Sequence, residues 1–122
     1  MIRNCLVPAL KERYPNVAFT FSDSSQPFAS VVCPVSEMGR LDIYDDGDEA
    51  TIDISEITHG HFNPYETMSE PDRDKWVTEA VTSFLDALFA DRVLLYRTPN
   101  RHMGGWQVHD DRIDRTVPLS GF

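Results

Sequence analysis

The sequence is poor in cysteine and has no long hydrophobic run. Its two cysteines, Cys5 and Cys33, have a spacing that fits neither a zinc pair nor a redox C-x-x-C motif. No disulfide framework is therefore expected, and both residues are predicted to be buried thiols. The apolar stretch 5–10 contains a proline and is too short for a secretory leader or a membrane-spanning helix. We expect a cytoplasmic protein with no membrane partner.

Basic residues are also scarce, and this limits the kind of partner. The 122 residues include 11 Lys and Arg against 20 Asp and Glu, which gives a net charge of −9. Such a balance argues against nucleic acid as a partner. Residues 42–91 hold fourteen of the acidic residues and only two basic ones. This concentration predicts either a solubilising surface or a negative field that attracts a basic protein partner.

Apolar periodicity predicts an α+β fold in a single domain covering residues 1–122, with an irregular tail at 111–122. Helical spacing predicts a short N-terminal helix capped by Asn4 and a long helix over about 70–90 capped by Ser69. Strands are predicted at 17–21, 28–33, on both sides of the turn in 40–57, at 93–96 and at 106–110. Strands in runs indicate a mostly antiparallel sheet of about five or six strands, packed against both helices.

The clearest local signal is a hairpin across residues 40–57, where apolar and polar residues alternate on both sides of an acidic turn. A turn centred on Asp46-Gly47 sets Arg40 opposite Asp53. A turn centred one residue later sets Asp42 against Asp53, which is a repulsive cross-strand pair. The first register avoids this repulsion and is the preferred prediction.

Two further segments are interpreted from weaker patterns. After residue 54 the alternation slips, so the strand is predicted to end or bulge there, and residues 58–65 are predicted to form a loop with some extended character that leads into the long helix. The continuous apolar run 93–96 has the composition of a central strand. One face or edge of the sheet remains for solvent or a partner, which is also consistent with a homodimer.

His59 and His61 are the candidate metal ligands. On an extended backbone, residues i and i+2 point the same way, so the two imidazoles could share one metal ion. The Asp-His pair that follows the HxH of metallo-hydrolases is missing, and no HExxH occurs. The alternative function is therefore a small metal-dependent or ligand-binding enzyme that uses these histidines, with Asp42 or Asp53 as carboxylates.

Other catalytic and cofactor signatures are absent from the sequence. The acidic turn 45–49 does not have the ligand register of an EF-hand loop, and its Asp-Gly pair is explained by hairpin chemistry. Neither a G-x-S-x-G motif nor a phosphate-binding glycine loop occurs. No catalytic residue and no cofactor is assigned.

The leading hypothesis is a non-catalytic protein-binding module, acting as an adaptor, an inhibitor or a chaperone, that engages a basic partner. Carboxylates would steer the encounter, and aromatic side chains would supply desolvated contact area. The predicted partner-binding residues are Asp42, Asp45, Asp46, Asp48, Glu49, Asp53, Tyr44, Tyr65 and Trp106. Trp106 is interpreted as either a core residue or an interface anchor. The order of elements and the acidic character resemble the small dimeric chaperones of bacterial secretion systems, with no shared motif and without their third, C-terminal helix.

Overall fold

The computed structural model describes residues 1–23, 26–33, 39–55, 57–97 and 104–113. The elements are α1 (Ile2–Arg13), β1 (Thr20–Phe21), β2 (Ala29–Val32), β3 (Arg40–Asp45), β4 (Ala50–Ile54), β5 (Thr58–Phe62), α2 (Glu70–Phe89), β6 (Val93–Arg97) and β7 (Gly104–Val108). Strands β1 to β5 form an antiparallel meander in chain order, and β6 pairs with β7 in a separate two-stranded sheet. The predicted α+β fold is confirmed. Residues 114–122, most of the tail, lie outside the described residues.

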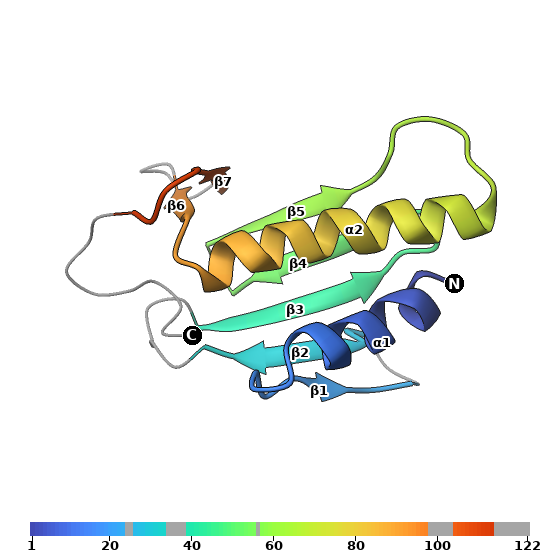
Figure 1. The fold of residues 1–122 in the computed structure, drawn as a ribbon, viewed down its shortest axis with the longest axis horizontal. Helices are drawn as coiled ribbons and strands as arrows, with labels where there is room; N and C mark the ends of the chain where they lie inside the picture. Colours follow the sequence, from blue (N-terminus) through green and yellow to red (C-terminus); the bar gives the residue numbers. More distant parts are fainter. Residues whose placement is uncertain (24–25, 34–38, 56, 98–103, 114–122) are drawn as a thin grey trace.

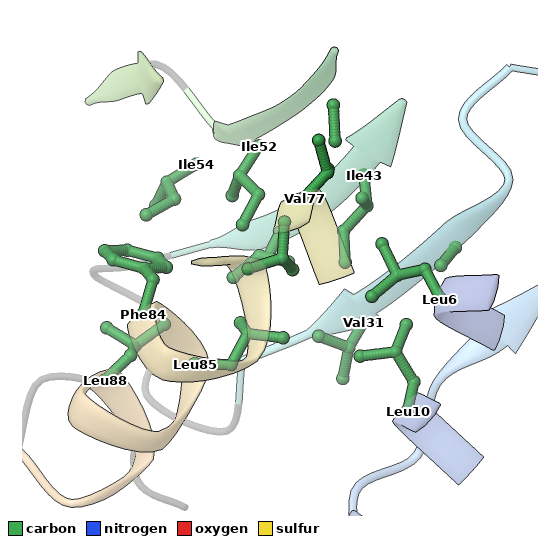
Figure 2. Packing of buried hydrophobic residues seen from close by; sticks show 14 of the residues in the cluster. Leu6, Leu10, Val31, Ile43, Ile52, Ile54, Val77, Phe84, Leu85 and Leu88 are labelled. Carbon is green, nitrogen blue, oxygen red and sulfur yellow. The ribbon is translucent and has the colours of Figure 1, made fainter. Parts of the chain in front are cut away.

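A single hydrophobic core lies between the five-stranded sheet and the two helices, which cover the same face of the sheet (Figures 1 and 2). Its fully buried members include Leu6 and Leu10 of α1, Leu41 and Ile43 of β3, Ile52 and Ile54 of β4, and Val77 and Leu85 of α2. Burying each such side chain stabilises the fold by about 1.5–3 kcal/mol. Leu41 and Ile43 of β3 and the buried residues at every second position of β4 point into the core, so the residues between them, including Asp42 at 9% exposure, point to the opposite face.

Helix α1 begins earlier than the sequence predicts. It starts at Ile2, its N-cap side chain makes no hydrogen bond, and Asn4 lies inside the helix. The extra residues bring Ile2 into the core in line with Leu6 and Leu10, all with no exposed surface. Burial of Ile2 therefore outweighs the capping preference of Asn4. Pro8 consequently lies inside the helix, where its missing N–H removes one helical hydrogen bond.

Two strand predictions are wrong. Residues 58–62, expected as loop, form β5, because Ile57 N donates to Ile54 O and reverses the chain directly after β4. The slip in alternation thus marks a tight turn, with Ser55 at a φ of 43°, rather than the end of the sheet. Strand β6, expected in the centre of the sheet, pairs only with β7 among the described strands. Its apolar run is partly buried because Val93 and Leu95 contact the main core.

Helix α2 follows the sequence prediction closely. Ser69 is its N-cap, and the Ser69 hydroxyl accepts a hydrogen bond from Asp72 N at 3.4 Å. Most of the apolar stripe is buried, Ala80 and Phe89 are partly buried, and Trp76 is 38% exposed. In the described part of the chain, no helix combines the length and the apolar character needed to cross a membrane.

A polar clasp fastens the end of α1 to α2. The Arg13 guanidinium binds the Asp86 carboxylate, with Nε 2.9 Å from Oδ1. The Tyr14 hydroxyl lies 2.7 Å from the same Oδ1 and 2.9 Å from the carbonyl oxygen of Thr82. The hydrogen bond from Arg13 holds the pKa of Asp86 below its usual value, whereas burial raises the pKa of Tyr14.

We expect Asp86→Asn to lower the free energy of unfolding at pH 7 by about 1 kcal/mol, a modest figure because the charge is partly screened by solvent. A lowered pKa in the folded state means that the carboxylate stabilises the fold above the unfolded pKa, and that this stabilisation disappears as the pH falls through the folded pKa. Urea unfolding from pH 7 down to about pH 3 should show the wild type and the variant converging. A gap that stays constant over this range would contradict the role of the clasp.

Candidate protein-binding face

The face of the five-stranded sheet that points away from the helices is not covered by any element in the described part of the chain (Figure 1). Side chains reach it at every second position of the strands, because their neighbours are in the core. We call this surface the open face. It comprises Ser30, Val32, Arg40, Asp42, Tyr44, Asp46, Glu49, Thr51, Asp53, His59 and His61.

Antiparallel pairing arranges the open face in cross-strand rows. The central row is Ser30, Asp42, Asp53 and His59, and the second row is Tyr44, Thr51 and His61. Side chains of directly paired residues have Cβ atoms about 4.5–5.5 Å apart. The candidate histidines and the candidate carboxylates therefore share one surface.

The register between β3 and β4 sets Asp42 directly opposite Asp53, so the preferred prediction of Arg40 opposite Asp53 is wrong. The two-residue turn is centred on Gly47-Asp48, closed by Asp46 N donating to Glu49 O at 2.9 Å. Gly47 has a φ of 94°, the left-handed conformation that a type II′ turn requires at its first central position.

Packing inside the sheet explains this register. It pairs Leu41 with Ile54 and Ile43 with Ile52, so large aliphatic residues meet each other on the buried face. The competing register would set Ile54 opposite Gly39 and leave that side chain without a large partner. Better apolar pairing on the buried side therefore outweighs one like-charge contact on the open face.

Asp42 has its charge compensated by two neighbours. Arg40 Nε lies 2.9 Å from Oδ1 and Arg40 Nη2 lies 3.1 Å from Oδ2, while the Ser30 hydroxyl donates to Oδ1 at 2.7 Å. The hydrogen bond to Asp42 raises the pKa of Arg40. Charge-assisted bonds of this kind lower the cost of placing a second carboxylate opposite Asp42.

Asp53 has no such compensation. Its carboxylate is half-buried in the centre of the open face and makes no hydrogen bond or ion pair with the residues that the structure describes. The neighbouring Tyr44 is affected by this charge, because burial and then the negative charges of Asp42 and Asp53 raise the pKa of Tyr44. The central row of the open face thus carries a negative charge that no described residue compensates.

The acidic turn adjoins the second row. The Thr51 hydroxyl donates to the Asp46 carboxylate, and Nδ1 of His61 lies 3.0 Å from Glu49 Oε2. These bonds hold two turn carboxylates against the open face. Asp48 is exposed at the tip of the turn. We call Asp46, Asp48, Glu49 and Asp53 together the acidic patch.

Asp45, also predicted to bind a partner, has a different environment. Its side chain is only 4% exposed, and its carboxylate accepts from Gly47 N at 2.9 Å and from Arg3 N at 3.1 Å. Arg3 Nε lies 3.8 Å from the same carboxylate. Asp45 therefore connects α1 to the turn and is not part of the acidic patch.

The three predicted aromatic residues do not lie together. Tyr44 lies on the open face beside the central row. Tyr65 is 86% exposed in the loop after β5, which leaves from the turn end of the sheet because Phe62 pairs with Ala50. Trp106 lies on the helix side of β5, where it packs beside the inward-facing Gly60.

Trp106 joins the two-stranded sheet to the main core. Its ring centroid is 4.3 Å from that of Phe84 and 6.0 Å from that of Phe62, with the Phe62 ring stacked at 19°. Trp106 is half-buried by these contacts. The sequence does not predict this packing, because it requires β5 to be a strand with Gly60 on its inner side.

The described residues bring few potential metal ligands together. Among the described residues, no group of three or more His, Cys, Asp or Glu side chains is arranged to hold a metal ion. His59 and His61 do lie together, with ring centroids 5.3 Å apart. Cys5 and Cys33 are free thiols, and burial raises the pKa of Cys33 to about 11.

Comparisons with known protein families, with curated proteins and with solved structures give no match to this chain. The resemblance in element order to secretion chaperones is therefore not accompanied by a structural match. Function has to be inferred from the open face itself.

Asp53→Asn should raise the free energy of unfolding by about 0.5 kcal/mol, because it removes a like-charge pair and breaks no hydrogen bond of the described residues. Asp42→Asn should lower it, since Arg40 loses its anionic partner. Urea unfolding of both variants at low and high salt tests these expectations. The increase in the free energy of unfolding from Asp53→Asn should become smaller at high salt, because salt screens the repulsion between Asp42 and Asp53. Destabilisation by Asp53→Asn would show that its charge has a structural partner.

Gly60→Ala should lower the free energy of unfolding by about 1–3 kcal/mol, because the packed side cannot accept another carbon. A Cβ at this position would lie 2.0 Å from the Trp106 ring. In a Trp106→Leu background the smaller side chain leaves room, so the same substitution should cost less. If Gly60→Ala lowered the free energy of unfolding equally with Trp106 and with Leu at position 106, this double-mutant cycle would show no coupling and would exclude the contact.

Proposed function

We propose that this protein is a non-catalytic binding module whose open face engages a basic protein partner. The observation that supports the proposal best is the Asp53 carboxylate of the central row, which no described residue compensates and which lies directly opposite a second carboxylate. The acidic patch continues this negative charge along the surface to the tip of the β3–β4 turn.

The cost of this arrangement favours a binding role over simple solubility. Carboxylates that only keep a protein soluble can occupy any exposed position, and there they cost no folding energy. Asp53 instead lies beside Asp42 on a half-buried surface, where like charges destabilise the fold. A cationic side chain from a partner would relieve this repulsion on binding, so binding would recover energy that the free protein loses.

Binding would proceed in two stages. The acidic patch attracts a basic protein over a distance of about one Debye length, roughly 10 Å at 0.1 M salt, and raises the association rate. An arginine or lysine of the partner then approaches Asp53, while Tyr44 beside the central row and Tyr65 supply aromatic contact area. The alternative, a metal-dependent enzyme using His59 and His61, has no specific catalytic arrangement in its favour among the described residues.

The test is a neutralised patch variant, Asp48→Asn, Glu49→Gln and Asp53→Asn combined. Basic proteins retained on the immobilised wild type from a native lysate of the source cells should be lost on this variant. With a retained protein in purified form, the association rate should fall about tenfold or more when ionic strength rises from about 10 mM to about 500 mM.

A second triple variant, Glu12→Gln, Glu66→Gln and Glu79→Gln, is the matched control. It removes the same amount of charge from exposed positions outside the open face. It should bind the partner as the wild type does. Equal loss of binding in both triple variants, or an association rate that does not change with salt, would refute a specific role of the acidic patch.

A further inference from the structure

We infer that His59 and His61 form a chelate for one divalent late transition-metal ion, such as zinc or nickel, on the exposed side of β5. The inference rests on the juxtaposition of the two imidazoles and on the contacts that orient one of them. It does not depend on the proposed protein partner.

The backbone fixes the two rings at a suitable separation. Both residues point to the open face from positions i and i+2 of one strand, and both are exposed. Their ring centroids are 5.3 Å apart. Two imidazoles on one tetrahedral zinc, with Zn–N bonds of about 2.0–2.1 Å, have centroids about 5 Å apart. The observed spacing therefore suits a shared metal ion without movement of the strand.

The contacts of His61 involve Nδ1 and leave Nε2 free to face a metal ion. Its Nδ1 lies 3.0 Å from Glu49 Oε2 and 3.0 Å from Thr51 Oγ1. The Thr51 hydroxyl donates its hydrogen to Asp46, so its oxygen accepts from His61. In the neutral imidazole Nδ1 therefore carries the proton, which leaves the lone pair of Nε2 for a metal ion. A carboxylate on the far nitrogen of a histidine is the usual outer contact of metal-bound imidazole.

The surrounding charge also favours a cation. Asp53 is the direct cross-strand partner of His59, and Glu49 contacts His61. Because no third side-chain ligand is in place among the described residues, water would occupy the remaining coordination positions. We therefore assign an exposed, exchangeable site rather than a buried structural one.

Titration of zinc or nickel into tag-free, chelator-treated protein tests the site by calorimetry. The wild type should bind one equivalent. His59→Ala and His61→Ala should each weaken binding at least about tenfold, and Glu49→Gln should weaken it about 10–100-fold, the usual loss when an outer contact of a ligating histidine is removed. His109→Ala, at the exposed end of the two-stranded sheet, is the control and should bind as the wild type does.

Paramagnetic broadening by nickel in NMR spectra of the wild type locates the site without any substitution. Signals of β5 around residues 59–61 should broaden first. Absence of saturable binding, broadening centred elsewhere, or unchanged affinity in His59→Ala or His61→Ala would overturn the inference. An unchanged affinity in Glu49→Gln would contradict the orienting role of that carboxylate. These measurements use metal alone, so their failure leaves the basic-partner proposal untouched.

Discussion

The register between β3 and β4 is the constraint on which the rest of the structure depends. On the buried side it pairs Leu41 with Ile54 and Ile43 with Ile52, which gives the core its aliphatic layer under α2. The same register brings two carboxylates together on the other side. Burial of each large side chain contributes about 1.5–3 kcal/mol, whereas a like-charge pair costs less than about 1 kcal/mol. The core therefore determines the pattern of charge on the open face.

Only one of the two paired carboxylates on the open face has its charge compensated by described residues. This difference between Asp42 and Asp53 connects the fold to the proposed function. Arg40 and Ser30 bond to Asp42, and within the described residues nothing does the same for Asp53. The turn adds further negative charge because hydrogen bonds hold Asp46 and Glu49 against the second row. The proposed basic partner and the proposed metal cation would both meet the negative charge of this one surface.

Local signals were sufficient to predict some elements and the residues of the acidic patch, but not how the sheet arranges those residues. Helix α2 could be predicted because Ser69 and the apolar stripe act within a few residues of each other. The hairpin could be predicted as well, but its register could not. The donors to Asp42 include Ser30 on another strand, so the cost of the Asp42–Asp53 pair looks larger in the sequence than in the structure.

Strand β5 also depends on a contact with a distant part of the chain, and its strand conformation was not predicted from the sequence. Gly60 weakens its strand signal, and the contact that explains this glycine comes from Trp106, far along the chain. Without β5 as a strand, His59 cannot be placed opposite Asp53, so their direct cross-strand pairing was not predictable from the sequence. The most direct measurement of the open face is NMR relaxation by small soluble nitroxides of positive, neutral and negative charge. We expect the cationic probe to relax amide protons of β4 and the β3–β4 turn most strongly, and equal relaxation by all three probes there would contradict an uncompensated negative surface.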